Sequence, residues 1–195
     1  MNYDISTIGY AILGLLSWRA LSGYDLKGMF AGSVALHWSG NNNQIYKTLV
    51  ELHRANLVDV EVETKETGPA RKVYRITEAG VAALRAWVIT RPEPPQLRHQ
   101  LLMQLAWADQ LTQAELNALL DEYEGEVRHH LAMLQTQERN LAASKANTTY
   151  INTALARTSR EAFLWRMIWR NWIGVYENEL NWLRQVRDGL TLFNA

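Results

Sequence analysis

Apolar positions in the first part of the chain recur mostly at helical spacing. The range Ile5–Trp18 is apolar at this spacing, which predicts a short and mostly buried helix. A second helix is predicted to begin at Ser22, because Asp25 stands three residues later in the order of a capping box. A third helix follows the segment SGNNN and runs to about Ala55, where Asn56 suits the left-handed residue that ends many helices.

The period then changes from helical to alternating. Val58, Val60 and Val62 share one face, which predicts a half-buried strand. The segment TGPA turns the chain, and RKVYRIT, residues 71–77, returns as the second strand of a β-hairpin. Thr77 is expected to cap a fourth helix. The order of three helices, a two-stranded wing and a fourth helix is that of a winged helix-turn-helix domain.

A proline-rich segment divides the chain into two predicted domains. Residues 91–97 contain three of the four prolines and are expected to link a winged helix domain of residues 1–90 to a helical domain of residues 98–195. The second domain begins with a short helix over 98–109. It continues with a helix of about thirty residues over 113–143, which a capping box and a near-3.6-residue apolar period predict. The fold class is therefore mainly α.

The last helix is expected from Thr158 to about Arg187, opened by a capping box with Glu161. One side of it carries a broad apolar stripe, and Trp182 falls outside this stripe. Aromatic residues are enriched at buried interfaces, so the stripe is a candidate dimer surface or effector pocket. The residues of this stripe are Trp165, Ile168, Trp169, Trp172, Tyr176, Leu180 and Leu183.

Two interpretations of this stripe are open. In the first, it packs against the long helix and against a second subunit, which gives a helical homodimer that carries two winged domains. In the second, the dimer is retained but some tryptophans line a cavity for a flat aromatic effector. Adjacent helical positions point about 100° apart, so His129 and His130 are not expected to share a metal ion.

Charge and composition exclude several classes of protein. Lys plus Arg and Asp plus Glu number 20 each, so the chain lacks the excess of positive charge of strongly basic nucleic-acid binders. The absence of cysteine excludes disulfides, thiol catalysis and cysteine-ligated zinc. The apolar run from Ile8 to Leu16 is too short to span a bilayer, so we expect a cytoplasmic protein without a membrane partner.

The third helix presents a polar face suited to DNA. A rotation of 100° per residue places Asn43, Lys47 and Arg54 on the side opposite the apolar residues, with Val50 and Glu51 beside them. Asparagine and glutamine can bind adenine through two hydrogen bonds in the major groove, and lysine can reach guanine or phosphate. The plain alternative is that the amides cap the helix and that the cations are ordinary solvated residues.

The hairpin adds basic residues that could contact the DNA backbone or the minor groove. Three glutamates on the same hairpin dilute this positive charge, so an ordinary charged hairpin is the alternative interpretation. Double-stranded DNA is the expected partner. The candidate DNA-binding residues are Asn41, Asn42, Asn43, Gln44, Tyr46, Lys47, Arg54, Lys65, Arg71 and Lys72.

Three segments, LLSWRALSGYDL, NQIYKTLVELHRANLV and GPARKVYRITEAG, resemble the PadR family of bacterial winged-helix regulators. The C-terminal half resembles the larger, AphA-like and phenolic-acid-regulator-like branch. The resemblance implies a DNA-binding transcriptional regulator that acts as a homodimer on a pseudo-palindromic operator, with a C-terminal region that holds the dimer together. The family usually has a small residue, Pro and Gly before the Ile-Tyr pair, where this chain has Asn42, Asn43 and Gln44. The operator sequence of a relative therefore does not predict the operator of this chain.

The sequence also bears on two rival functions. An enzyme is not expected, because the chain has no phosphate-cradling glycine loop, no HExxH motif and no nucleophile elbow, and its histidines are scattered. A scaffold that binds only protein through its aromatic helices is the alternative function, and the near-zero net charge supports it. No metal or cofactor is predicted beyond the small aromatic effector of the second interpretation.

Overall fold

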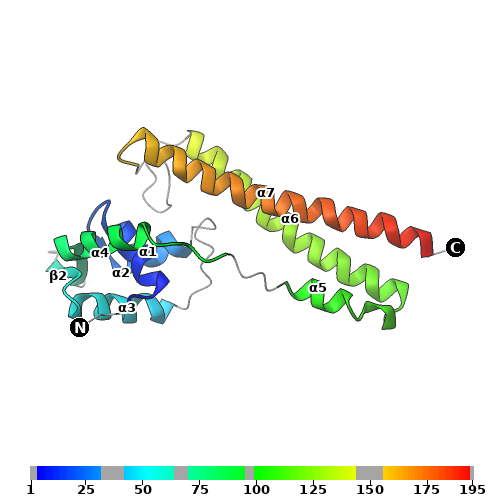
Figure 1. Ribbon diagram of the computed structural model, residues 1–195, viewed down its shortest axis with the longest axis horizontal. Coiled ribbons are helices and arrows are strands. Elements are labelled where there is room, and N and C mark those ends of the chain that lie inside the picture. Colours follow the sequence, from blue (N-terminus) through cyan, green and yellow to red (C-terminus); the bar gives the residue numbers. More distant parts are fainter. Residues whose placement is uncertain (1–3, 32–41, 64–69, 95–98, 144–155, 194–195) are drawn as a thin grey trace. The chain divides into compact units, whose positions relative to one another are not determined.

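The computed structural model describes residues 4–31, 42–63, 70–94, 99–143 and 156–193 of the chain (Figure 1). Two compact units divide it: Met1–Pro92 with Lys145–Ala162, and Glu93–Ser144 with Phe163–Ala195. The elements are α1 (Thr7–Leu16), β1 (Leu21–Ser22), α2 (Gly23–Ala31), α3 (Asn42–Arg54), β2 (Val58–Glu63), β3 (Arg71–Ile76), α4 (Glu78–Val88), α5 (Gln100–Leu105), η2 (Ala108–Gln110), α6 (Gln113–Ala143), α7 (Ser159–Leu190) and η4 (Thr191–Phe193).

The core of the first unit lies between α1, α2 and α3. These helices bury their apolar faces because burial of a large aliphatic side chain stabilises a fold by about 1.5–3 kcal/mol. Helix α4 packs against α1, where the rings of Tyr10 and Trp87 stack with centroids 4.7 Å apart. The predicted order of helices and hairpin is confirmed. The fully buried residues of this core are Ile8, Ile12, Leu13, Leu16, Leu26, Met29, Ile45, Leu49 and Leu52.

The sheet of the first unit has three antiparallel strands in the order β1-β3-β2. The predicted hairpin of β2 and β3 is confirmed, with Val58 opposite Ile76 and Glu63 opposite Arg71. The prediction of a two-stranded wing missed β1, where Leu21 lies opposite Tyr74. A strand of two residues is too short to show any alternation, and its partner lies about fifty positions away along the chain.

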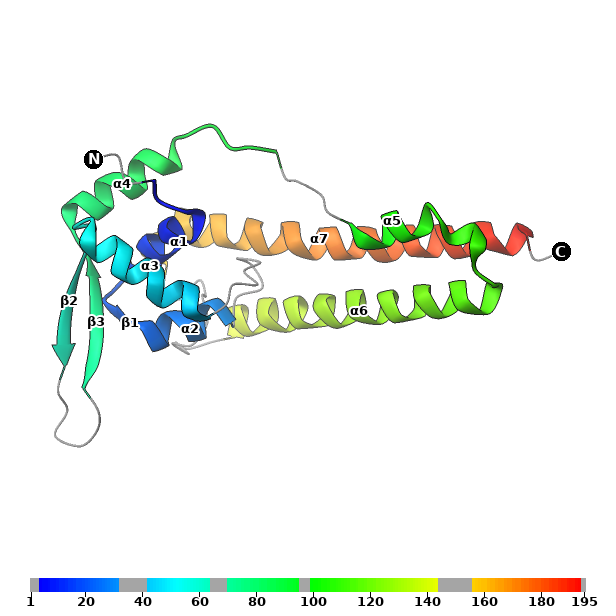
Figure 2. The same cartoon turned by 90° about the horizontal axis from the view of Figure 1, so that it is seen from below.

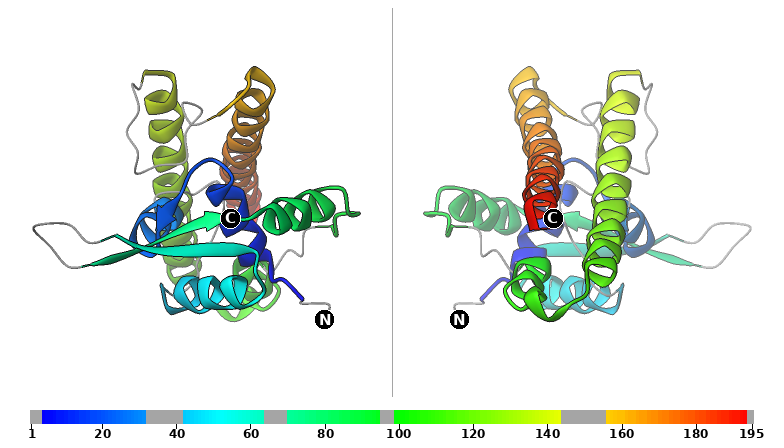
Figure 3. Two further views of the ribbon diagram at one scale, coloured as in Figure 1. Left: turned by 90° about the vertical axis from the view of Figure 1, so that its left-hand side faces the viewer. Right: turned by 90° about the vertical axis from the view of Figure 1, so that its right-hand side faces the viewer.

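The prediction that Val58, Val60 and Val62 share one buried face is wrong for the outer half of the strand. Val58 is fully buried and Val60 is partly buried, but Val62 is 61% exposed. Figures 2 and 3 show β2 and β3 lying side by side as a ribbon that extends away from the helices of the first unit. The outer residues of the ribbon therefore have no helix to pack against, and only the inner residues join the core.

Helix starts follow the predicted capping residues. The Ser22 hydroxyl accepts a hydrogen bond from Asp25 N at 3.1 Å, and the Thr77 hydroxyl accepts one from Gly80 N at 3.0 Å. At α6 the Thr112 backbone N–H donates to the Glu115 carboxylate at 2.8 Å. Such caps satisfy N–H groups that have no partner inside the helix.

The second unit is built on α6 and α7, which lie side by side and run antiparallel (Figures 1 and 2). His130 stacks on Tyr176 with ring centroids 5.6 Å apart, and Arg187 donates to Asp121 at 2.6 Å. At one end α5 closes an apolar cluster, and Trp182 packs against this cluster. Trp182 falls outside the apolar stripe predicted on the last helix, which we call the α7 stripe. The buried members of the cluster are Leu101, Ala108, Leu116, Leu120 and Leu183.

The first turn of α7 belongs to the first unit, although the rest of the helix lies in the second. The Trp18 indole N–H donates to the Glu161 carboxylate at 2.8 Å, and the Arg157 backbone N–H donates to the same carboxylate at 2.7 Å. The Arg157 guanidinium also donates to the Ser17 carbonyl at 3.2 Å. Burial raises the pKa of Glu161, but these hydrogen bonds outweigh burial and hold the pKa below its ordinary value.

Half of the predicted capping box at α7 is present. The Thr158 hydroxyl accepts from Glu161 N at 3.0 Å, whereas the Glu161 carboxylate accepts from Arg157 and Trp18 and so joins α7 to the end of α1. The helix also continues to Leu190, past the expected end near Arg187. Within the described residues, no helix has the length and apolar character needed to cross a membrane.

Candidate nucleic-acid interface

Helix α3 presents one polar side to solvent. Ile45, Leu49 and Leu52 face the core and are almost fully buried. On the opposite side, exposed residues follow one another at spacings of three and four positions, which places them in a line along the helix. We call this line the outward stripe: Asn43, Lys47, Val50 and Arg54.

The remaining predicted residues of this helix flank the outward stripe. Gln44 is exposed and Tyr46 is 45% exposed. Asn42 is the first residue of α3, and Asn41 lies outside the described residues. The Lys47 ammonium lies 3.9 Å from the Glu51 carboxylate one turn later, an exposed pair that contributes little to stability. The ammonium therefore remains able to exchange this partner for a phosphate.

The ring of Tyr46 lies against Gly23, the first residue of α2. A Cβ atom at position 23 would lie 3.0 Å from Tyr46 Cδ1 and closer still to Cε1. Only glycine allows the ring to approach the backbone of α2 in this way. Gly23 therefore shapes the contact between α2 and α3, and its only signal in the sequence is a glycine directly after a helix cap.

The Ser22 and Asp25 pair fixes the start of α2 beneath this ring. The Ser22 backbone N–H and hydroxyl donate to the Asp25 carboxylate at 2.9 and 2.7 Å. Burial raises the pKa of Asp25, but these hydrogen bonds outweigh burial and hold the pKa below its ordinary value. The cap therefore stays formed at neutral pH.

A tight turn sets the hairpin relative to α3. Asn56 ends the helix with φ of 58°, the left-handed conformation predicted for it. The Leu57 carbonyl then accepts a hydrogen bond from Thr77 N at 3.1 Å. Gly80 in α4 lies so close that a Cβ atom there would collide with the Leu57 carbonyl and would lie 2.8 Å from Ile76 Cγ1. One glycine therefore lets α4 approach the junction between α3 and the wing.

The predicted basic residues of the wing differ in their environments. Arg71 and Lys72 are both exposed at the start of β3. The Arg71 guanidinium donates to the Glu63 carboxylate across the ribbon at 2.8 Å, so much of its charge is already compensated. Lys72 has no ion pair with a described residue within 4.0 Å. Lys65 lies outside the described residues. Lys72 is therefore better placed than Arg71 to contact a phosphate.

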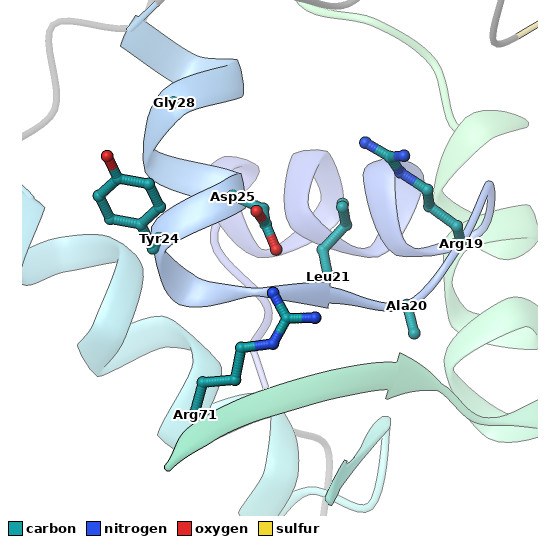
Figure 4. Close-up of a pocket in the computed structure, with 7 residues that line it drawn as sticks. All are labelled: Arg19, Ala20, Leu21, Tyr24, Asp25, Gly28 and Arg71. Atoms are coloured by element: carbon teal, nitrogen blue, oxygen red, sulfur yellow. The ribbon is translucent and has the colours of Figure 1, made fainter. Parts of the chain in front are cut away.

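A shallow hollow of about 310 Å³ lies between the start of α2 and the start of β3. Figure 4 shows the Arg71 side chain directed toward the Asp25 carboxylate, with the Tyr24 ring on the outer side of α2. Opposite charges thus share this hollow. The lining residues are Arg19, Ala20, Leu21, Tyr24, Asp25, Gly28 and Arg71.

The α7 stripe is buried unevenly. Trp169 and Leu183 are buried, and Ile168 is 40% exposed. Trp165, Trp172, Tyr176 and Leu180 are partly buried. The indole N–H of Trp169 is buried without a hydrogen-bond acceptor among the described residues. Further apolar residues of α7 outside the stripe are more than 40% exposed: Phe163, Leu164, Met167 and Val175.

A polar cluster in the second unit was not foreseen from the sequence. His99 Nε2 lies 2.9 Å from the Glu179 carboxylate, and the Tyr123 hydroxyl donates to the same oxygen at 3.1 Å. His99 Nδ1 accepts from Leu102 N at 3.3 Å and so caps α5. Burial and the neighbouring Glu179 charge raise the pKa of Tyr123, which therefore remains a hydrogen-bond donor. The cluster joins α5, α6 and α7.

His129 and His130 do not form a metal site with other described groups. Their rings lie 5.9 Å apart and nearly perpendicular, and His130 stacks on Tyr176 instead. Within the described part of the chain, no group of three or more histidine, aspartate or glutamate side chains is placed to hold a metal ion.

In comparisons with known proteins, both parts of the chain match a family model. Residues 12–86 match the model of the transcriptional regulator PadR-like family, and residues 97–191 match the model named virulence activator alpha C-term. The chain therefore carries a PadR-like domain followed by a domain of the virulence activator alpha C-terminal type. A negative transcriptional regulator PadR of Bacillus subtilis is 29% identical over 136 residues, which cover 69% of this chain and 75% of that protein.

Solved structures of PadR-like proteins show the same fold. The Bacillus subtilis PadR structure in complex with operator DNA has a TM-score of 0.76 at 23% identity, over 93% of this chain and 97% of that one. Its structure with p-coumaric acid has a TM-score of 0.70 at 24% identity, over 93% and 96%. The Vibrio cholerae virulence activator AphA has a TM-score of 0.69 at 26% identity, over 96% and 99%.

The PadR-like match distinguishes a transcriptional regulator from a protein-binding scaffold. The predictions of a transcriptional regulator and of a winged helix domain with a helical C-terminal part are confirmed over the scaffold alternative. The roles of the individual DNA-binding and α7 stripe residues stay predictions.

Proposed function

We propose that this PadR-like protein binds double-stranded DNA in the cytoplasm as a homodimer and regulates transcription without catalysing a reaction. The outward stripe of α3 carries this proposal. It combines an amide, two cations and an apolar side chain on an exposed helix that buried residues hold from behind. A helix of this kind fits the major groove, and its N-terminal residues contact the base edges in helix-turn-helix proteins.

The wing supplies the second part of the proposed interface. Lys72 is exposed at the start of β3 and contacts a phosphate, whereas Arg71 remains near Glu63 and holds the ribbon. Base contacts then come from α3, and charge contacts that are independent of sequence come from the wing. The Bacillus subtilis PadR complex with operator DNA supports this placement, since it has the same fold.

Selection of bound duplexes from a random library, followed by footprinting, tests DNA binding directly. We expect enrichment of a pseudo-palindrome whose half-sites lie about 34–36 Å apart or a multiple of this spacing, because each recognition helix contacts one half-site. Binding should weaken steeply as salt rises, since contacts to phosphates release counterions. A protein that enriches no sequence would contradict the proposal.

The homodimer is proposed from the apolar residues that α7 leaves exposed. Phe163, Leu164, Met167, Ile168 and Val175 are all 40–52% exposed, which is much apolar surface for one side of one helix. Burial against the same surface of a second chain would remove this area from water.

Light scattering coupled to size exclusion should give a mass near twice 22.4 kDa. Met167→Glu places a charge in the apolar surface and should yield monomers, because a buried unpaired charge is strongly destabilising. Arg184→Glu, at an exposed position of the same helix that points away from this apolar surface, should leave the dimer intact. Monomeric wild-type protein would exclude the proposed assembly.

We also propose that the second unit binds a small aromatic effector near Trp169. The supporting observation is the buried indole N–H of Trp169 that lacks an acceptor, because such a group costs about 1–3 kcal/mol unless a partner reaches it. The structure of Bacillus subtilis PadR with p-coumaric acid gives a probe compound.

Calorimetric titration with p-coumaric acid separates the packing and pocket interpretations of the α7 stripe. Binding that is lost in Trp169→Phe and kept in Trp107→Phe, at a largely exposed tryptophan, would support a pocket. No heat of binding with the wild type would favour packing alone.

A further inference from the structure

Val50 is an exposed apolar residue in the middle of the outward stripe. It is 45% exposed and lies one turn after Lys47 and one turn before Arg54. The buried positions around it on α3 are occupied by Thr48, Leu49 and Leu52, so the core does not require an apolar residue at position 50. A β-branched residue is also a weaker helix former than the polar residues common on helix surfaces. Neither packing in the first unit nor helix propensity explains this valine.

In the proposed placement of α3, the outward stripe that includes Val50 faces the bases of the major groove. Asn43 and Arg54 are separated by about 16 Å along the helix axis, at 1.5 Å per residue. This length corresponds to about five base-pair steps of 3.4 Å. Val50 lies between these ends, where its side chain would meet a base edge and not the phosphate backbone.

We propose that Val50 recognises the 5-methyl group of a thymine in each operator half-site. This inference rests on the proposed placement of α3 in the major groove. The methyl group of thymine is the apolar feature of the major groove, whereas the other base edges present hydrogen-bond donors and acceptors. Valine cannot satisfy those polar edges, and a buried donor or acceptor without a partner weakens binding. Val50 therefore favours thymine both by contact with its methyl group and by exclusion of polar edges.

Removal of a single methyl group provides the test. The duplex selected by the wild-type protein is synthesised with each thymine replaced in turn by deoxyuridine, which differs only in lacking this group. Fluorescence anisotropy titrations then give the dissociation constant of each duplex. We expect one thymine in a half-site whose replacement weakens wild-type binding about fourfold, the value for one buried methyl-sized group.

The matching protein variant is Val50→Ala. It should bind the thymine duplex more weakly than the wild type and should lose clearly less than fourfold when that thymine becomes deoxyuridine, because alanine reaches less far toward the methyl group. Val81→Ala is the control, because Val81 is also a helical valine, is 49% exposed and lies in α4 outside the outward stripe. This control should keep the wild-type loss of about fourfold at the same thymine.

The outcomes are distinguishable. If Val50→Ala retains every deoxyuridine effect of the wild type, Val50 does not contact a thymine methyl group and the inference is wrong, although DNA binding stands. If the wild type selects no duplex, the proposed function fails and the inference fails with it. Circular dichroism checks folding, and Val50→Thr, which keeps one methyl group and the branched shape, should give an intermediate deoxyuridine effect.

Discussion

Gly80→Ala tests whether the close approach of α4 to the turn after α3 holds the first unit together. Alanine in place of glycine within a helix stabilises by up to about 1 kcal/mol. At position 80, however, the added Cβ would collide with the Leu57 carbonyl, which cannot move freely because it accepts from Thr77 N at 3.1 Å. Overpacking of this kind costs about 1–3 kcal/mol, and a fixed backbone neighbour favours the upper value. We therefore expect a net loss of about 2 kcal/mol in the free energy of unfolding.

Urea denaturation followed by circular dichroism measures this change, and thermal melting should show the first unit unfolding about 8–16 °C earlier. Gly14→Ala in α1 is the matched control within the same unit, because an added Cβ atom would meet open space beyond the backbone of its own helix. This variant should be as stable as the wild type or more stable, by up to about 1 kcal/mol. Equal stability of Gly80→Ala and Gly14→Ala would refute the argument that Leu57 limits the space at position 80.

Two further predictions concern DNA contacts and pH. Asn43→Ala should relax base preference on selected duplexes. Lys72→Ala should instead weaken binding to all duplexes alike and reduce the slope of log affinity against log salt by about one. Equal effects of the two changes would contradict the proposed roles of Asn43 and Lys72. Glu161→Gln should lower the free energy of unfolding by about 1–2 kcal/mol at neutral pH. Because the folded pKa of Glu161 lies below its ordinary value of 4.5, the stability that its charge adds is present above that value and is lost as pH falls through the folded pKa. The gap between wild type and Glu161→Gln in urea titrations should therefore close in acid, and a gap independent of pH would show that the charge of Glu161 does not matter.

Features set by local sequence were predicted well. Ser22, Thr77 and Thr112 cap helices through residues three positions away, so each cap is contained in four consecutive residues. The exposed side of α3 also follows from the helical period alone, since Asn43 and Lys47 differ in direction from the buried positions whatever the helix packs against.

Features that depend on distant partners were not predicted. The pair of Arg71 with Glu63 requires the register of the hairpin, which neither residue encodes alone. The bond from Trp18 to Glu161 joins residues 143 positions apart. Trp182 packs against the apolar cluster that α5 closes. This contact depends on the placement of α5, a helix of six residues whose sequence shows no clear apolar period.

The sharing of α7 between the two units limits where the protein can be cut. A fragment that ends at Pro92 would contain all four N-terminal helices but would leave the Trp18 indole without its carboxylate acceptor and the Ser17 carbonyl without Arg157. The DNA-binding half is therefore not an autonomous module of contiguous sequence. Exchanging it between relatives requires the first turn of the last helix to be transplanted along with it.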